Sequence, residues 1–357
     1  MMIGKRTRDL SVNLRTLGHF TTGVQRYLHG ILPHLKNELL EIKPHRSLQG
    51  IAGHLWEQAI LPWQLNGSLL WSPGNTGPLG VGRQVITMHD ASSLEHPEWF
   101  EPRFAAWYRF MLPRLAKKVR RIITVSEIMK IRLASLLSIS EDRVVAIPNG
   151  VEPQFNPAPS DAIADLRARL SLEEPFVLYV GSLEPRKNLP RLLEAWAQVD
   201  SAGFNLVVAG SVGHVFRQTK LTHTNRVKLI GRVSDNDLPV LYSAAHAFVF
   251  PSVYEGFGLP PLEAMACGCP VLSSSSTSLP EVCGPAFNPL NPEQGAVIYF
   301  DPFDTNSISG ALATMLSLPS PLRTSMAAAA LRRAAGFSWE NSAKTTLRVL
   351  RDAASDS

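Results

Sequence analysis

The strongest chemical signal in the sequence is the block PSVYEGFGLPPLEAMACGCP at residues 251–270. It holds two glutamates, Glu255 in a glycine-rich stretch and Glu263 beyond a pair of prolines. Proline is favoured where a helix begins, so the block predicts a glycine-rich turn and a helix with Glu263 in its first turn. Such a turn directs a row of backbone N–H groups and the positive end of a helix at one point, which suits a phosphate. Carboxylates beside a phosphate would accept hydrogen bonds from sugar or ribose hydroxyls; the alternative for Glu263 is a carboxylate favoured by the helix dipole.

A second signal is the adjacent pair Arg186 and Lys187, which follows the apolar run 176–180 and precedes a helical pattern over 189–199. A diphosphate gains negative charge as its bond to a sugar breaks, so two fixed cations would stabilise it without a metal. The alternative is a solvated pair at a helix start. Since the helix dipole disfavours positive charge there, the sequence favours an anion-binding role.

In the first half of the chain, His89 and Asp90 come directly after the apolar run 85–88. Histidine hydrogen-bonds hydroxyl groups in either tautomer and titrates near neutral pH. A buried structural His–Asp pair is the competing interpretation. Gly23 stands at an expected strand–helix turn, where backbone without a side chain could approach a phosphate; an ordinary turn glycine fits as well.

These residues lie within a repeated alternation of strand-like and helix-like segments. Such alternation is typical of the α/β class, with parallel sheets covered by helices. In these sheets ligands bind beyond the carboxyl ends of the strands, where the residues above are expected. The proline-rich segment 149–161 is the best candidate for a linker. The expected strands are 85–88, 121–125, 144–147, 176–180, 205–209, 227–230, 247–250 and 270–273.

Together these motifs resemble the retaining GT-B glycosyltransferases of family 4. The Glu-x7-Glu block resembles their donor-site signature, and VGSLEPRKN at 180–188 resembles the strand and loop that carry their phosphate-binding Arg and Lys. The segment 21–26, TTGVQR, stands in for a more glycine-rich loop. The resemblance extends over nearly the whole chain. Other segments that resemble family motifs are 87–90, 125–127, 148–151, 208–211 and 231–234.

The resemblance implies a GT-B fold, an α/β architecture of two Rossmann-like domains facing across a cleft. It implies an acceptor-binding domain at 1–157 with a returning C-terminal helix at about 336–357, and a nucleotide-sugar-binding domain at 158–335. The implied reaction moves a hexose from a nucleotide diphosphate sugar to a saccharide or lipid-linked saccharide with retained configuration. The resemblance leans toward bacterial mannosyltransferases of surface polysaccharide (O-antigen and lipopolysaccharide) assembly, with GDP-mannose as the first donor to test and a UDP-sugar as the second. An inactive sugar-nucleotide-binding partner subunit and a GT-B-fold nucleotide-sugar epimerase are the alternatives.

The resemblance also assigns roles to residues at matching positions. It places Glu255 and His89 against the transferred sugar and Glu263 at the ribose hydroxyls, and it has Asp90 steady its loop or approach the acceptor. The expected catalytic residues are Arg186, Lys187, Glu255, His89 and Asp90. The expected donor-binding residues are Glu263, Gly256, Phe257, Gly258, Leu259, Gly23, Gly210 and Val233.

The sequence offers one candidate metal motif, Asp235-Asn-Asp237. An Asp-x-Asp pair holds a divalent cation in another glycosyltransferase fold. Here Ser234, with Asp237 three residues on, is typical of a capping box, and acidic residues in a first helical turn need no metal to explain them. There is also no P-loop and no dinucleotide fingerprint. We therefore expect no cofactor and no metal requirement.

The composition excludes several other classes of protein. The chain has 357 residues, 45% of them hydrophobic, which is enough for two domains. Its net charge of +5 is concentrated in residues 1–155, but it carries no nucleic-acid-binding signature. The three cysteines do not form a disulfide framework, the N-terminal residues are not typical of a secretory signal, and no apolar stretch is long enough to span a bilayer. These features predict a cytoplasmic protein.

The segment 103–121, RFAAWYRFMLPRLAKKVRR, predicts a basic helix with interleaved aromatic residues, which Pro113 should bend or divide. One interpretation is an interfacial helix that contacts anionic lipid on the inner face of the plasma membrane. The other is a domain helix with a solvated basic face. Both interpretations are compatible with packing on the sheet, because an expected strand follows directly.

Overall fold

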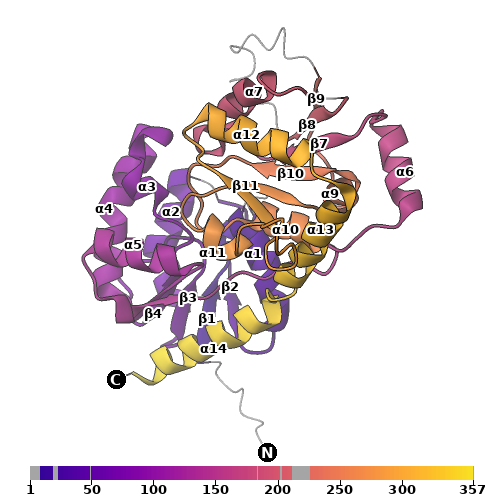
Figure 1. Cartoon of the computed structure of the whole chain (residues 1–357). Helices are drawn as coiled ribbons and strands as arrows, with labels where there is room; N and C mark the ends of the chain where they lie inside the picture. The colour runs from indigo at the N-terminus through magenta and orange to yellow at the C-terminus, as the bar shows by residue number, and fades with distance from the viewer. Residues whose placement is uncertain are drawn as a thin grey trace, which may run out of the picture. The chain divides into compact units, whose positions relative to one another are not determined.

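The chain forms two compact units, Met1–Gly150 with Ser338–Ser357, and Val151–Phe337. The expected domain boundary after residue 157 lies later in the chain than this division. The structure, a computed structural model shown in Figure 1, describes residues 9–18, 23–48, 50–182, 184–201, 203–210 and 226–356. Residues 21, 22, 183 and 211, which belong to segments that resemble family motifs, lie outside these ranges.

The first unit contains a six-stranded parallel sheet with the strand order β2-β1-β3-β4-β5-β6. Strands β1, β3 and β4 are buried at every position, as expected for parallel strands covered on both faces. Because β2 and β3 lie on opposite sides of β1, the topology reverses between β1 and β3. The strands are β1 (Leu10–Asn13), β2 (Leu40–Ile42), β3 (Leu69–Ser72), β4 (Gln84–Thr87), β5 (Arg121–Thr124) and β6 (Val144–Ala146).

The second unit contains another six-stranded parallel sheet, with the order β12-β11-β10-β7-β8-β9. Its topology reverses between β7 and β10, since β8 and β9 extend the sheet on one side of β7 and β10 to β12 on the other. Helices α7 and α12 cover one face, and α9 and α10 the other (Figure 1). The strands are β7 (Phe176–Val180), β8 (Asn205–Ala209), β9 (Val227–Gly231), β10 (Ala247–Phe250), β11 (Val271–Ser274) and β12 (Val297–Phe300).

The predicted α/β class is confirmed, and all eight predicted strands are present with ends that differ by at most one residue. Strands β1, β2, β3 and β12 were not predicted. Pro113 does not divide its helix, because α4 continues from Pro102 to Lys118. The helices of the first unit are α1 (Gly23–Ile31), α2 (Gly50–Ala59), α3 (Ser92–Glu95), α4 (Pro102–Lys118), α5 (Glu127–Leu137) and α14 (Trp339–Ser355). Those of the second are α6 (Ser160–Arg169), α7 (Leu189–Ala197), α9 (Leu238–Ala244), α10 (Leu259–Ala266), α11 (Leu279–Cys283), α12 (Thr305–Leu316) and α13 (Ser320–Ala334).

Helix α14 packs on the first unit at both of its ends. At its start the ring of Trp339 lies 5.7 Å from that of Tyr27, and Gly30 makes room, since a Cβ there would come within 2.2 Å of the indole. At its end the Arg120 guanidinium donates to the Ala353 carbonyl oxygen, and Arg121 lies 3.3 Å from the carboxylate of Asp356. Cations are favoured at a helix C-terminus, so these two arginines hold α14 in place.

Candidate active site

The loops after β7 and β10 bring three of the predicted catalytic residues together. The two strands are neighbours at the topological reversal of the second sheet, where open α/β sheets bind their ligands. Arg186 and Lys187 lie in a 3₁₀ turn after β7, and Glu255 lies in the loop after β10. Lys187 Nζ donates to Glu255 Oε1 at 2.6 Å, and Arg186 Nη1 donates to Oε2 at 3.1 Å.

The Lys187–Glu255 ion pair is buried. Lys187 is 9% exposed and Glu255 is 7% exposed, so the alternative of a solvated pair is excluded for Lys187. Burial lowers the pKa of the Lys187 ammonium, and the nearby Glu255 carboxylate opposes this shift. Burial would raise the pKa of the Glu255 carboxyl, but Lys187 and Arg186 together hold it below its usual value. Glu255 is therefore ionised near neutral pH, and both cations bond to it directly.

Arg186 connects this pair to a second carboxylate that the sequence did not reveal. Its Nε donates to Glu184 Oε2 at 2.7 Å, and its side chain is 21% exposed. Arg186 Nη1 also lies 3.4 Å from the Tyr254 carbonyl oxygen. The cluster of Arg186, Lys187, Glu184 and Glu255 thus contains two cations and two carboxylates.

Hydroxyl side chains hold the loop that carries Glu255, and no role for them followed from the sequence. Ser252 Oγ donates to Glu255 Oε1 at 2.6 Å, and the backbone N–H of Glu255 donates to Thr277 Oγ1 at 2.9 Å. Ser278 Oγ lies within hydrogen-bond distance of the Glu255 and Phe257 carbonyl oxygens. The signal in the sequence was the serine-rich segment after β11, whose residues face the β10 loop in the fold.

The prediction that Glu263 lies in a first helical turn is wrong. Helix α10 begins at Leu259, so Glu263 is one turn further along and is buried. Its Oε2 accepts a hydrogen bond of 3.3 Å from the Tyr242 hydroxyl of α9. Because the prolines at 260 and 261 lack an N–H, the expected row of backbone donors is limited to the residues before them. The backbone of this segment therefore offers fewer N–H donors than the sequence predicted.

Two of the predicted donor-binding glycines are required by the fold itself. Gly210 follows β8, and a Cβ there would lie 2.0 Å from the carbonyl oxygen of Gly181, so the loops after β7 and β8 touch. Gly258 caps α10 with φ +115°, a conformation that favours glycine, and a Cβ would meet Leu279 at 2.7 Å. The remaining residues of this group in the second unit are buried (Gly256, Phe257) or half-buried (Leu259, Val233).

In the first unit His89 is held in one tautomer. Its Nε2 lies 2.8 Å from the Pro73 carbonyl oxygen, which can only accept, so Nε2 carries the proton. Burial lowers the pKa of His89, so the neutral ring presents Nδ1 as an acceptor. Asp90 Oδ1 accepts from the backbone N–H and hydroxyl of Ser92, at 2.9 and 2.6 Å, and so steadies the start of α3. Gly23 begins α1, and a Cβ at this position would meet no atom within 4 Å, so packing does not demand glycine there.

The Asp-x-Asp segment lies in the turn before α9 and not, as predicted, in its first helical turn, although Ser234 makes the contact expected of a capping residue. The backbone N–H of Asp237 donates to Ser234 Oγ at 3.1 Å, just before α9 begins. Arg169 donates to the Asp237 carboxylate at 2.6 Å. Within the described ranges no three His, Cys, Asp or Glu side chains are grouped to hold a metal ion. Asp237 is thus explained by its contacts with Ser234 and Arg169.

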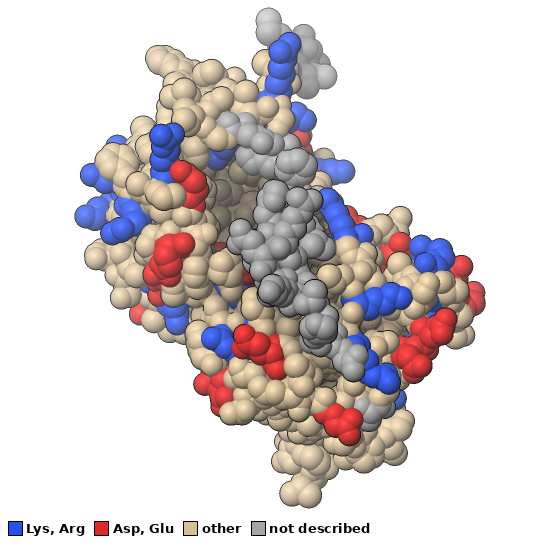
Figure 2. Space-filling model, turned by 90° about the horizontal axis from the view of Figure 1, so that it is seen from above, with Lys and Arg blue, Asp and Glu red and all other residues tan. Residues whose placement is uncertain are grey.

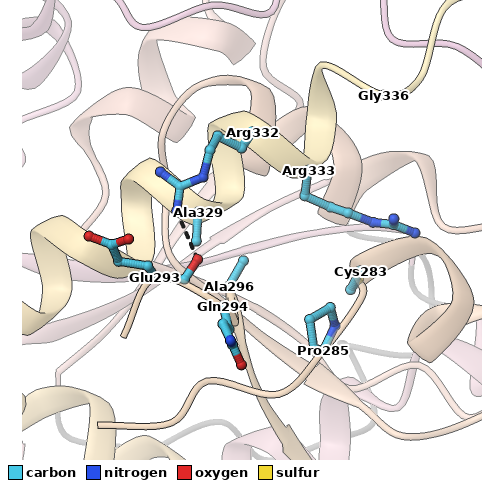
Figure 3. Close-up of a pocket in the computed structure, with 9 residues that line it drawn as sticks. All are labelled: Cys283, Pro285, Glu293, Gln294, Ala296, Ala329, Arg332, Arg333 and Gly336. Atoms are coloured by element: carbon cyan, nitrogen blue, oxygen red, sulfur yellow. Dashed lines mark hydrogen bonds between the residues drawn. The ribbon is translucent and has the colours of Figure 1, made fainter. Parts of the chain in front are cut away.

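A pocket of about 280 Å³ lies elsewhere in the second unit, between the region after α11 and helix α13 (Figure 3). Arg332 bends toward the main chain of Glu293 and donates to its carbonyl oxygen at 2.8 Å. Cys283 also lines the pocket. Burial raises the pKa of its thiol to about 12, so this thiol is not reactive at neutral pH. None of the predicted site residues lines this pocket.

Two parallel sheets, each with a topological reversal and polar loops at its carboxyl edge, define a doubly wound α/β protein of two domains. The family described as "Glycosyl transferases group 1" matches residues 164–333, and "Glycosyltransferase Family 4" matches residues 68–155. The chain belongs to this glycosyltransferase family and is a glycosyltransferase.

Individual relatives agree with this assignment. The O-antigen chain mannosyltransferase B of Escherichia coli is 32% identical over 333 residues, which cover 90% of this chain and 83% of that protein. The serotype-specific mannosyltransferase WbdA of Escherichia coli is 32% identical over 275 residues, 73% of this chain but only 32% of its own length. The chain therefore spans about a third of that second relative.

Solved structures confirm the fold. The crystal structure of Anabaena Alr3699/HepE in complex with UDP and glucose matches with a TM-score of 0.78 and 17% identity. The match covers 96% of this chain and 99% of that one. The predicted GT-B fold, with two Rossmann-like domains, is therefore confirmed.

We predict that Glu255→Gln lowers the free energy of unfolding by about 3 kcal/mol, because it leaves Lys187 buried without a counter-charge. The pKa of Glu255 is lower in the folded state than its ordinary value of 4.5. The ion pair therefore stabilises the protein at pH values above 4.5. That contribution is lost as the pH falls through the folded-state pKa. The difference between wild type and variant in urea unfolding should accordingly shrink in acid.

The exposed Glu174 provides a matched control, since Glu174→Gln removes a carboxylate without a buried partner. The double variant Lys187→Met with Glu255→Gln should be less destabilised than the sum of the single changes. Equal unfolding free energies for Glu255→Gln and Glu174→Gln would contradict a stabilising role for the pair.

Proposed function

We propose that this glycosyltransferase transfers mannose from GDP-mannose to a saccharide or lipid-linked saccharide acceptor, with retention of configuration and without a metal ion. The observation that carries the proposal is the buried contact of Arg186 and Lys187 with Glu255 at the topological reversal of the second sheet. The choice of mannose is supported by relatives named as O-antigen mannosyltransferases.

The cation pair suits a diphosphate leaving group. In the proposed step the bond from the anomeric carbon to the diphosphate oxygen breaks, and the electron pair leaves with the nucleoside diphosphate. Arg186 and Lys187 stabilise the charge that develops there, and they are already fixed before the reaction by their bonds to Glu255. The acceptor hydroxyl forms the new bond on the same face, and its proton passes to the departing phosphate oxygen.

The two glutamates have different tasks in this proposal. Glu255 stands at the cations, where its negative charge also favours positive charge at the anomeric carbon. We assign Glu263 to the ribose hydroxyls, which change little during the reaction. His89, neutral and with Nδ1 as an acceptor, is assigned a hydrogen bond from a hydroxyl of the transferred sugar.

We predict that Arg186→Ala, Lys187→Ala and Glu255→Gln each lower kcat by about 10² or more, because each removes charge that acts on the transition state. Glu263→Gln should mainly raise the KM for the donor, because ribose contacts bind substrate and transition state alike. Steady-state kinetics with GDP-mannose, after thermal melting has verified folding, measure both effects. Glu174→Gln serves as the control. A near-normal kcat for Glu255→Gln beside a complete loss for Glu263→Gln would show that the roles are reversed.

We predict that activity persists in EDTA, because two protein cations replace a metal at the diphosphate. The assay compares initial rates of GDP release with EDTA, magnesium and manganese after exhaustive dialysis against chelator. A rate that EDTA abolishes and manganese restores would refute the metal-free mechanism. The variant Asp235→Asn would then show whether the Asp-x-Asp segment holds the ion.

A membrane surface on the first unit is the second part of the proposal. Among the described residues no helix is both long and apolar enough to cross a bilayer. Helices α2 and α4 meet where the ring of His54 packs 5.6 Å from that of Trp107. Around them large apolar side chains are exposed: Ile51 by 78%, Leu55 by 63% and Trp63 by 86%, with Phe104 and Phe110 on α4. We call this the α2–α4 surface.

Helix α4 contributes basic side chains to the α2–α4 surface. In Figure 2, Lys and Arg form one group at the left of the view and are otherwise spread over it. Arg120 and Arg121 are not counted in this surface, because both contact the end of α14. The exposed cations of α4 are Arg103, Arg109, Arg114, Lys117 and Lys118. Exposed tryptophan and leucine beside arginine are typical of a surface that inserts at an anionic bilayer. We therefore propose peripheral contact with anionic lipid.

We predict that the wild type sediments with vesicles of anionic lipid and not with zwitterionic ones. Arg103→Gln with Arg109→Gln should weaken binding by about fivefold for each charge, equivalent to about 1 kcal/mol. Trp63→Ala should weaken it without changing its salt dependence. Leu290→Ala removes a side chain that is 95% exposed in the second unit and is the apolar control. A wild type that ignores anionic vesicles at low salt would overturn this part of the proposal.

A further inference from the structure

A buried charged cluster lies at the topological reversal of the first sheet. Arg15 follows β1 and Thr76 follows β3, the two strands between which the strand order reverses, and Glu57 reaches them from α2. Arg15 Nε lies 3.3 Å from Glu57 Oε1. Thr76 Oγ1 accepts from Arg15 Nη2 at 2.9 Å and donates to Glu57 Oε1 at 3.1 Å. We call these three residues the Arg15 cluster.

The Arg15 cluster is sealed from solvent. Its members are 4%, 1% and 1% exposed for Arg15, Glu57 and Thr76. The chain makes room for it, because a Cβ at Gly53 of α2 would lie 2.8 Å from Arg15 Nη1. A buried ion pair is weak evidence for a stabilising role, since the cost of removing both charges from water can exceed their attraction. The cluster is better explained by the chain segment that it holds in place.

The cluster holds the segment 73–77, which in turn holds His89. Thr76 ties this segment to Arg15 and Glu57, while Pro73 and Asn75 contact the histidine. The backbone N–H of His89 donates to Asn75 Oδ1 at 2.7 Å, and His89 Nε2 donates to the Pro73 carbonyl oxygen at 2.8 Å. The backbone N–H of Asn75 also donates to the carbonyl oxygen of Thr87 at 3.0 Å. The segment thus connects the cluster to the backbone N–H and to the ring Nε2 of His89.

We propose that Arg15, Glu57 and Thr76 are positioning residues that fix His89 with its proton on Nε2 and its Nδ1 as an acceptor. They act by clamping the segment 73–77, so that the Pro73 carbonyl oxygen stays in line with the imidazole. If the clamp loosens, the ring loses this acceptor and the Nδ1–H tautomer becomes populated. In that tautomer Nδ1 donates a hydrogen bond, whereas in the Nε2–H tautomer it accepts one. The proposal rests on the proposed function only for the effect on catalysis, not for the effect on the tautomer.

The test compares Thr76→Val with Thr76→Ser. Valine keeps the shape of threonine but removes the hydroxyl that bridges Arg15 and Glu57, whereas serine keeps it. Thr16→Val is the matched control, because the Thr16 hydroxyl is buried with no hydrogen-bond partner in the described part of the chain. The readout is ¹⁵N NMR of histidine-labelled protein without substrate, with the His89 signals assigned by their loss in His89→Gln.

We expect wild type, Thr76→Ser and Thr16→Val to show the Nε2–H form of His89, and Thr76→Val to show a mixture of both forms. In steady-state kinetics Thr76→Val should lose about 10-fold or more in kcat with little change in the donor KM, because a displaced group costs rate rather than binding. Thermal melting checks that the variants are folded. If Thr76→Val does not fold, Glu57→Gln is measured in the same way.

A single Nε2–H form in folded Thr76→Val, or in Glu57→Gln where that variant replaces it, would overturn the proposal. A mixture of tautomers with an unchanged kcat would support the positioning role and refute the assignment of His89 to the reaction. A lower kcat with the tautomer unchanged would again overturn it, since Thr76 would then act by another route.

Discussion

The contact between Lys187 and Glu255 constrains the whole carboxyl edge of the second sheet. Removing an ammonium and a carboxylate from water costs several kcal/mol for each ion, which only a short, well-aligned contact can offset. The loops after β7 and β10 must therefore stay in a fixed relation. Hydrogen bonds supply that relation. Val253 N–H donates to the Arg186 carbonyl oxygen at 2.8 Å, and the side-chain Nδ2 of Asn188 donates to the carbonyl oxygens of Pro251 and Pro302.

Asn188 shows how local conformation serves this edge. It separates the 3₁₀ turn with the two cations from α7 and has φ +58°, a left-handed conformation that asparagine tolerates better than most residues. The chain turns there, so Arg186 and Lys187 do not continue into α7, where the dipole of the helix would oppose their charge. The cations are instead stabilised by Glu255 and Glu184, and their positions are set before any anion arrives.

The parts of the fold that could be predicted from sequence are those with local signals. The central strands of the second sheet are apolar runs, and Arg186, Lys187 and Glu255 lie in the loops after two of them, so their place at the carboxyl edge of the sheet could be predicted. Strand β2 was not, because it has three residues, two of them exposed, and so lacks an apolar run. The position of Glu263 was missed because α10 begins at Leu259, before the two prolines that predicted its start.

The Arg15 cluster was missed for a related reason. A lone arginine after a short strand carries no signal of its own, and its partners Glu57 and Thr76 come from separate elements that only the fold brings together. The two sheets differ in how far solvent reaches the corresponding residues. Both sheets place an arginine and a glutamate at the topological reversal, but Arg186 is 21% exposed whereas Arg15 is 4% exposed. Charge that a ligand can reach acts on that ligand directly. A buried charge can act only by holding the residues around it in place, and in the first sheet those residues position His89.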